Sequence, residues 1–285
     1  MKVLNRKYHF FLLILIGQLF SSCNHKNDSS YYDLEYKYLF LSHTRTRLYD
    51  AVFMDSIVES KDFSKYDMLL LGGDLAWNTS GSTECMENVN SHFDLSSINT
   101  LWTMGNHDII DMDLIESYTG RPPFYATYNN GLCFIVFNTM DSSEFISGDQ
   151  LALFNSLMDT LDVSSHLIIL THHLVWMLGN SDLEGLISET SNAPYGSCSY
   201  CLKENNFYET IYPRLIEAKQ NGIEVLCLAG DLGVKAKEFE FLTAEGIYFL
   251  ASGIYEGDSI KKALILDHFP NRRKLFWYYK DLDQL

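Results

Sequence analysis

The sequence predicts an α/β fold, because short apolar stretches typical of strands alternate along the chain with amphipathic stretches typical of helices. Two further observations support this class. Polar motifs containing Gly, Asn, Asp or His follow several of the apolar stretches, as expected where parallel strands end at one edge of an open sheet. The chain has 285 residues, of which 47% are hydrophobic, and this suits one large folded domain.

Most of the predicted strands in the first half of the chain are separated by helical or turn-like segments. Helical spacing of apolar residues occurs at residues 51–58 and 85–93. The turn Asn129-Asn130-Gly131 between two apolar stretches predicts a hairpin. We expect strands at residues 36–41, 68–71, 101–104, 124–128 and 132–137.

The second half continues the alternation. Turn residues at Glu245-Gly246 and Pro270-Asn271 predict antiparallel hairpins within residues 239–279. Residues 178–206 have the composition of a long loop without a readable motif, and we expect this loop to carry substrate specificity. The remaining predicted elements are helices at residues 150–161 and 208–219 and strands at 167–170 and 225–228.

The N-terminus has the pattern of a bacterial lipoprotein signal. Basic residues precede an apolar run at residues 10–20, and Ser21-Ser22-Cys23 follows it. The apolar run is shorter than the roughly 20 residues that a membrane-spanning helix needs. A transmembrane anchor is therefore the weaker alternative. We therefore expect a signal peptide at 1–22 with lipidation of Cys23.

This signal predicts a domain organisation and a location. A tether at residues 23–35 would join the lipid-anchored Cys23 to a domain at 36–285, held at the bacterial cell envelope on the periplasmic or cell-surface side. Removal of residues 1–22 takes away three cations and changes the formal charge from −16 to −19. Such an acidic chain argues against nucleic acid as a partner, and an anionic substrate would need local cations.

The other cysteines suggest different environments. Cys133 and Cys227 lie in apolar strand-like stretches, where we expect buried, unpaired thiols. Cys198 and Cys201 lie in a loop rich in Gly and Ser, where a local disulfide, half of a zinc site and two free thiols are all compatible with the sequence.

Five motifs at the predicted strand ends carry the candidate site. Carboxylate, amide and imidazole groups that meet at one sheet edge suit Mn, Fe or Zn. The motifs are Ser42-His43-Thr44-Arg45, Gly72-Gly73-Asp74, Gly105-Asn106-His107-Asp108, Thr171-His172-His173 and Gly230-Asp231-Leu232-Gly233. Trp77 and Trp176 follow two of them closely and are candidates for lining a cleft, although core packing is the simpler interpretation.

From about residue 36 to residue 255, the order of these motifs resembles that of calcineurin-like metallophosphoesterases. The resemblance implies a four-layer α/β/β/α sandwich and a two-metal site that hydrolyses phosphate esters. It implies that Asp74 bridges the two ions and that Asn106 and His172 bind the second, with His173 as the alternative to His172. It also implies that His107 stabilises charge on the phosphoryl group and that Asp108 orients His107.

Two motifs depart from the family pattern. His43 and Arg45 lie where the family has Asp-x-His, and Asp231 and Gly233 lie where it has Gly-His-x-His. The first ion loses two of its four ligands, so we expect this position to be lost or weakened.

The second ion keeps four candidate ligands, which are Asp74, Asn106, His172 and Asp231. Arg45 carries a fixed positive charge and a fork of donors that suits phosphate, so it is expected to replace part of the missing ion, with Arg47 as the spare candidate. His43 is expected to be a general base or an additional ligand.

The sequence thus predicts a hydrolase of phosphorylated small molecules or other anionic esters that uses one or two divalent Mn, Fe or Zn ions. The alternative is a non-catalytic protein of the same fold that binds an anionic ligand or assists assembly of the envelope.

Overall fold

Two β-sheets lie at the centre of the part of the chain that the computed structural model describes, which is residues 35–140, 144–161 and 163–285. The predicted signal peptide, Cys23 and most of the tether lie outside these residues. The first sheet has the order β11-β10-β1-β2-β3. Its strands are β1 (Tyr36–Leu41), β2 (Met68–Leu71), β3 (Thr100–Trp102), β10 (Lys262–Phe269) and β11 (Lys274–Asp281).

The second sheet has the order β4-β5-β6-β7-β9-β8. Strands β5, β6, β7 and β9 are parallel, and the edge strands β4 and β8 pair antiparallel to their neighbours. The strands are β4 (Tyr125–Asn129), β5 (Leu132–Val136), β6 (His166–Thr171), β7 (Glu224–Ala229), β8 (Glu238–Leu242) and β9 (Tyr248–Ser252).

Both sheets are buried on both faces, which explains why their central strands are continuous apolar runs. Successive side chains of a strand point to opposite faces. In β1, Tyr38 and Phe40 pack between the sheets, where they meet Phe134 of the second sheet, while Leu39 and Leu41 belong to a separate cluster on the outer face. Each fully buried aliphatic or aromatic side chain contributes about 1.5–3 kcal/mol of hydrophobic stabilisation.

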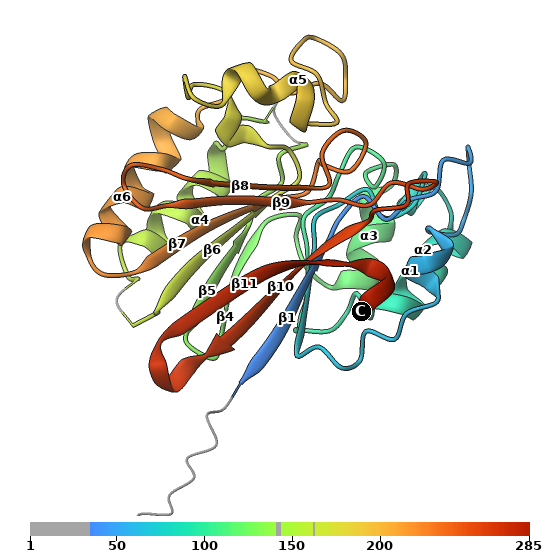
Figure 1. Ribbon diagram of the computed structural model, residues 1–285, viewed down its shortest axis with the longest axis horizontal. Helices are drawn as coiled ribbons and strands as arrows, with labels where there is room; N and C mark the ends of the chain where they lie inside the picture. The colour runs from blue at the N-terminus through green and yellow to red at the C-terminus, as the bar shows by residue number, and fades with distance from the viewer. Residues whose placement is uncertain (1–34, 141–143, 162) are drawn as a thin grey trace, which may run out of the picture. The chain divides into compact units, whose positions relative to one another are not determined.

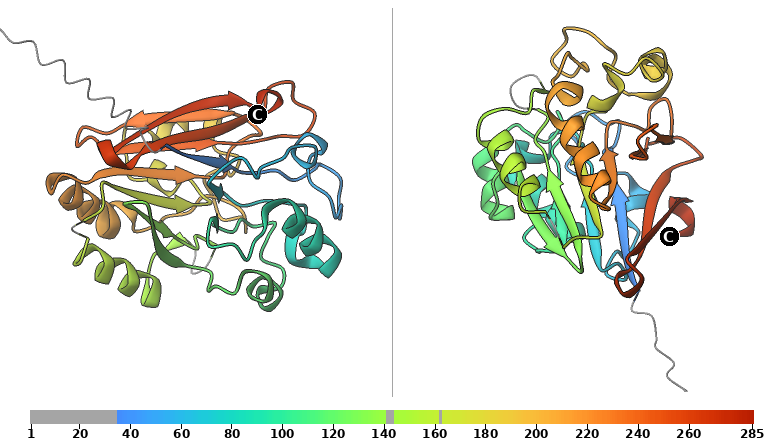
Figure 2. Two further views of the ribbon diagram at one scale, coloured as in Figure 1. Left: turned by 90° about the horizontal axis from the view of Figure 1, so that it is seen from below. Right: turned by 90° about the vertical axis from the view of Figure 1, so that its left-hand side faces the viewer.

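Helices cover the two outer faces, and the resulting α/β/β/α layering confirms the predicted fold class (Figures 1 and 2). The first sheet is covered by α1 (Ser56–Glu59), α2 (Thr83–Phe93) and α3 (Met112–Thr119), and the second by α4 (Gly148–Met158) and α6 (Tyr212–Gln220). The remaining short helices are α5 (Ile187–Thr190), η1 (Thr79–Gly81), η3 (Val175–Met177), η4 (Glu184–Leu186), η5 (Phe207–Ile211, a π turn), η6 (Pro270–Arg272) and η7 (Leu282–Gln284).

Two helices differ from the prediction. The helix expected at residues 51–58 is limited to α1, because Met54 pairs with Arg45 in a β-bridge and the Asp55 carboxylate caps the helix by accepting the N–H of Ile57. Helix α3 was not predicted from the sequence, although its ends carry ordinary signals. Asp111 caps its N-terminus, and Gly120 follows its C-terminus with a φ of +63°.

Two longer segments also differ. The predicted loop at residues 178–206 contains η4, α5 and a disulfide between Cys198 and Cys201, which decides among the three alternatives for this cysteine pair. Residues 239–279 form hairpins as predicted, but β8–β9 belongs to the second sheet and β10–β11 to the first. The free thiols of Cys133 and Cys227 are buried, as expected.

Within the described residues, no helix combines the length and apolar character needed to cross a bilayer.

Candidate metal centre

The carboxyl ends of β1, β2, β3, β6 and β7 meet at one edge of the sandwich, and the five motifs lie there. Hydrogen bonds join the motifs both within the first sheet and between the two sheets. The N–H of His43 donates to the carbonyl of Gly73 at 2.9 Å, and the Ser42 hydroxyl donates to the carbonyl of Gly230. A Cβ atom on Gly230 would lie 1.7 Å from the carbonyl oxygen of Gly72, so this close approach of the sheets requires glycine at residue 230.

Asp74 lies at the centre of this edge, with its carboxylate buried among cationic and imidazole groups. Its Oδ2 is 3.5 Å from Nε of Arg45 and 3.7 Å from Nε2 of His43. Its Oδ1 is 3.6 Å from Nε2 of His172 and accepts the backbone N–H of His107 at 3.0 Å. Burial raises the pKa of the Asp74 carboxyl, but His172, His107, His43 and Arg45 together bring this pKa well below its usual range. Asp74 is therefore an anion that can bind a cation.

Three imidazoles of the site each bond a backbone carbonyl through Nδ1, and this hydrogen bond sets their tautomers. Nδ1 of His172 lies 2.8 Å from the carbonyl of Gly72, Nδ1 of His43 lies 2.9 Å from that of Ile254, and Nδ1 of His107 contacts that of Trp77 at 2.6 Å. A carbonyl only accepts, so each Nδ1 carries a proton and each neutral ring has a lone pair on Nε2. In His43 and His172, that lone pair is on the side of Asp74.

The protonation of these two imidazoles differs. Burial lowers the pKa of His43 to about 4, which keeps this ring neutral at physiological pH. Burial also lowers the pKa of His172, but the carboxylates of Asp74 and Asp231 outweigh this effect and raise it. His172 therefore lies between the carboxylates of Asp74 and Asp231, where its Nε2 can bind either a proton or a cation.

Asp108 has a different role from the one expected. The ring of His107 is oriented by the Trp77 carbonyl, and not by Asp108. The buried Asp108 carboxylate instead accepts the backbone N–H groups of Asp74 (2.7 Å), Leu75 (3.0 Å) and Gly105 (2.7 Å), and the hydroxyl of Thr79 (2.5 Å). It therefore holds together the loops that carry Asp74 and Asn106.

Asn106 lies in the loop that follows β3. Its neighbour His107 donates its backbone N–H to Asp74, and a Cβ atom on its other neighbour, Gly105, would lie 2.2 Å from Oδ1 of Asp74. The backbone on both sides of the half-buried Asn106 therefore contacts the Asp74 carboxylate.

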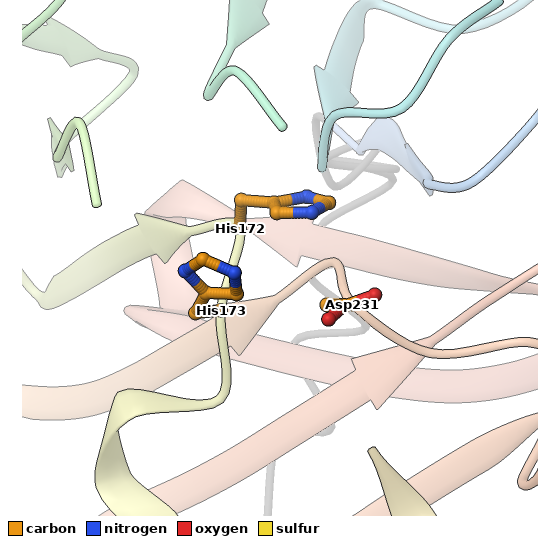
Figure 3. Close-up of side chains that lie close together, drawn as sticks. All are labelled: His172, His173 and Asp231. Atoms are coloured by element: carbon orange, nitrogen blue, oxygen red, sulfur yellow. The ribbon is translucent and has the colours of Figure 1, made fainter. Parts of the chain in front are cut away.

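His172, His173 and Asp231 form a cluster of potential ligands in which one ligand atom from each residue lies within 4.8 Å of the others (Figure 3). All three side chains are buried. Oδ2 of Asp231 accepts the N–H of Ala193 at 3.1 Å, which links the cluster to the loop at residues 178–206. Burial raises the pKa of Asp231; nearby His172 opposes this rise and Asp74 adds to it.

Two residues of this region received less weight from the sequence than their positions in the structure suggest. His173 was considered only as an alternative to His172, whereas the structure brings both imidazoles to Asp231. Glu144 was not considered, because no motif surrounds it in the sequence. This carboxyl is 2% exposed, lies 3.4 Å from Nδ1 of His173, and has a pKa that burial raises to about 8.

The altered motifs reshape the first ion position. A Cβ atom on Gly233 would lie 2.5 Å from the carbonyl oxygen of Ile254, so the backbone has no room for a ligand side chain there. Arg45 lies beside Asp74, and its guanidinium covers the ring of Trp77 at 4.9 Å. Arg47 lies over Tyr255 at 5.2 Å. Trp176 is buried and stacks on Phe249, so it belongs to the core and does not line the site.

The residues fit a divalent transition metal. Nε2 of His172 is buried without a hydrogen-bond partner among the described residues, and so are both ring nitrogens of His173. Unpartnered imidazole nitrogens beside the buried carboxylates of Asp74 and Asp231 form a nitrogen and oxygen donor set that suits Zn, Fe or Mn.

A cavity of about 370 Å³ adjoins the loop that carries Asn106. Met104 and Ile109, on either side of the Asn106-His107-Asp108 segment, contribute to its wall together with Trp102, Arg121 and Asn138. The lining of the cavity is mainly apolar.

Comparisons with solved structures found several similar chains. The chain is similar to the structure of a dimetal phosphatase from Danio rerio, with 10% sequence identity and a TM-score of 0.54 over 85% of this chain and 98% of that one. It also matches the NAD nucleotidase of Haemophilus influenzae, with 13% identity and a TM-score of 0.39 over 87% of this chain and 49% of that one. No curated protein sequence matches the chain.

The structural likeness at such low identity bears on the fold alone. The sequence itself carries the family assignment, because a profile described as calcineurin-like phosphoesterase matches residues 22–170, more than half of the chain. The chain belongs to the calcineurin-like phosphoesterase family.

Proposed function

We propose that this protein is a metal-dependent hydrolase of phosphate esters whose metal centre differs from the two-metal pattern of its family. The observation that carries the proposal is the position of Asp74, which lies between the Nε2 atoms of His43 and His172 and beside the Arg45 guanidinium. The best-supported ligands are Asp74, Asn106, His172 and Asp231. A divalent ion bound there supplies Lewis acidity toward a phosphoryl oxygen and lowers the pKa of a coordinated water.

The cationic side chains of the site give it a way to bind an anion within an acidic protein. The formal charge of −16 repels a phosphorylated substrate at long range, so attraction has to come from local groups. Arg45 keeps its charge at all physiological pH values, and its fork of donors matches phosphate oxygens. His107, whose Nδ1 is bound to the Trp77 carbonyl, would contact the phosphoryl group through Nε2.

Two features support a weakened first ion position. His43 and Asp74 are still available there, but Gly233 has no side chain and no space for one. Arg45 brings a positive charge to the same carboxylate oxygen that His43 faces. We propose that the guanidinium takes over part of the charge that a first ion would supply, and that the neutral His43 accepts a proton or completes a partial site.

The proposed substrate is a phosphorylated small molecule. The apolar cavity behind the Asn106 loop and the Ala193 contact of Asp231 are two places beside the site where the organic part of such a molecule can be selected. Both regions come from segments outside the motifs, so selectivity is separable from the metal chemistry.

We further propose that the protein is exported and lipid-anchored through Cys23 at the bacterial envelope. The Cys198–Cys201 disulfide supports this location, since disulfides persist mainly in oxidising compartments. Replacement of Cys23 by alanine should release the protein from the membrane fraction. Retention of the C23A variant in that fraction would contradict the lipid anchor.

Hydrolysis tests the enzymatic proposal. Wild type, incubated with Mn, Zn or Fe, should cleave bis(p-nitrophenyl) phosphate or p-nitrophenyl phosphate, and Asp74→Asn should lose this activity. Asn accepts the positive φ of +55° at residue 74, so this substitution removes the charge without backbone strain. Asp94→Asn is the matched control, because Asp94 is exposed and has a similar φ of +46°. No turnover by wild type with any of the three metals would refute the proposal.

A further inference from the structure

We infer that His173 is a direct ligand of the ion held by His172 and Asp231, and that Glu144 is the positioning residue that orients the His173 imidazole. This inference rests on the proposed metal-dependent function. It assigns a ligand role to His173 and a positioning role to Glu144, and the motif series requires neither.

The first argument is the geometry of the cluster. His172 and His173 are adjacent in sequence and directly follow β6, yet both rings turn toward the same space, with ring centroids 5.2 Å apart. Asp231 reaches this space from the end of β7, and one potential ligand atom from each of the three residues lies within 4.8 Å of the others. In Figure 3, one nitrogen of the His173 ring lies on the side of Asp231 and the other on the opposite side.

The second argument is the state of the His173 side chain. The residue is 1% exposed, and neither ring nitrogen has a hydrogen-bond partner among the described residues. Its backbone N–H, in contrast, donates to the hydroxyl of Thr139 at 3.3 Å. A buried imidazole with both nitrogens unpartnered is unfavourable, and coordination of one of them relieves this cost.

The third argument is the carboxylate behind the ring. Oε1 of Glu144 lies 3.4 Å from Nδ1 of His173 and also accepts the backbone N–H of Lys203 at 3.1 Å. Glu144 is buried and has a φ of +73°, an unusual backbone conformation for glutamate that the surrounding structure maintains. Ligating imidazoles commonly donate the N–H of their second nitrogen to a carboxyl or carbonyl oxygen, which fixes the tautomer and the ring orientation.

Together these contacts assign the two nitrogens of His173 different tasks. Nδ1 carries the proton and faces Glu144, which leaves the lone pair of Nε2 for the ion. The ion then has imidazole ligands from His172 and His173 and a carboxylate from Asp231, a set that favours zinc or iron over magnesium.

A cobalt titration tests this inference. Wild type, His173→Gln and Glu144→Gln are freed of metal and titrated with Co²⁺, while heat and visible absorption are recorded. We expect the apparent affinity for Co²⁺ to fall about 10- to 100-fold in Glu144→Gln and at least as far in His173→Gln, and the absorption bands of the bound ion to change in both. His268→Gln is the matched control for loss of a buried imidazole, because His268 contacts Tyr38 in the first sheet, and it should bind Co²⁺ as wild type does.

The double variant separates a positioning role from a second, independent effect. If Glu144 acts through His173, the double variant should bind Co²⁺ no more weakly than His173→Gln alone. Circular dichroism of the metal-free proteins checks that each variant is folded. If His173→Gln does not fold, the Co²⁺ affinity of the near-isosteric Glu144→Gln still tests the inference.

The possible failures are distinguishable. Unchanged Co²⁺ affinity and absorption in both single variants would overturn this inference and leave the proposed function standing. Absence of Co²⁺ binding by wild type would overturn both.

Discussion

Replacement of Asp108 by asparagine should destabilise the protein strongly, because this carboxylate joins the loops of the metal centre. Its two oxygens accept four donors: Oδ2 binds the N–H groups of Asp74 and Gly105, and Oδ1 binds the N–H of Leu75 and the hydroxyl of Thr79. Asparagine has one accepting oxygen, and its NH2 group would lie against the N–H and O–H donors that now bind the second carboxylate oxygen. The Thr79 hydroxyl can rotate to accept, but a backbone N–H cannot.

The size of the effect follows from these contacts. The best orientation of the new amide retains two backbone donors and leaves the N–H of Leu75 without an acceptor, which costs about 1–3 kcal/mol for a buried group. The two retained hydrogen bonds also lose their charged acceptor, and bonds to charged groups are worth about 1.5–3 kcal/mol each. Removal of a buried charge beside Asp74 offsets part of this loss. We expect the free energy of unfolding to fall by about 2–4 kcal/mol.

Urea denaturation in the presence of EDTA measures this change without a contribution from bound metal. Asp113→Asn is the control, since it removes the same charge from an exposed position in the first turn of α3 and should stay within about 1 kcal/mol of wild type. If Asp108→Asn unfolds with the same free energy as Asp113→Asn, Asp108 does not hold the two loops together.

Two further predictions concern the anion site and acid stability. Arg45→Ala should weaken inhibition by inorganic phosphate about tenfold or more, since charge-assisted hydrogen bonds are lost, and Arg47→Ala should not; equal inhibition constants in wild type and Arg45→Ala would contradict the phosphate role. Burial lowers the pKa values of His166 and His268 from 6.5 to about 4, so between these pH values the unfolded chain binds more protons than the folded one. The free energy of unfolding should therefore fall as the pH drops through this window, by about 1–3 kcal/mol per histidine, and the double variant with glutamine at both positions should flatten the slope in urea titrations. An unchanged slope would show that neither imidazole is responsible.

The layering and the strand ends were predictable because they depend on local signals. Strands buried on both faces must be apolar throughout, so β1, β2, β6 and β7 stand out as short apolar runs. A parallel strand of this kind delivers whatever follows it to the carboxyl edge of its sheet. That relation places Asp74 at the edge of the first sheet and Asp231 at the edge of the second, and the packing of the sheets brings these two edges together.

Contacts that depend on three-dimensional packing were not predictable in the same way. Glu144 reaches His173 from a different segment and has no sequence pattern around it, so only the fold shows that the two are neighbours. The role of Asp108 is similar: the family resemblance implied that Asp108 orients His107, whereas the folded loops present backbone N–H groups of residues 74 and 75 to its carboxylate.

Helix α3 is a different case, because its signals were present in the sequence. Asp111 and Gly120 mark its two ends, but its apolar face is short, and the segment lies directly after a motif with an obvious chemical interpretation. A capping analysis of residues 111–120 would have found it. The parallel pairing of β9 with β7 was hidden for another reason, since a hairpin signal at Glu245-Gly246 specifies the partner within the hairpin and not the sheet that the hairpin joins.

The central claim is that a divalent ion binds at the carboxyl edge of the two sheets, between Asp74, His172 and Asp231. Anomalous diffraction from crystals of the zinc-loaded protein tests it most directly, because the signal locates the ion independently of activity. The account predicts a peak about 2.0–2.2 Å from Nε2 of His172 and from a carboxylate oxygen of Asp231. A zinc-loaded crystal with no anomalous peak at this edge, or with zinc bound only elsewhere, would contradict it.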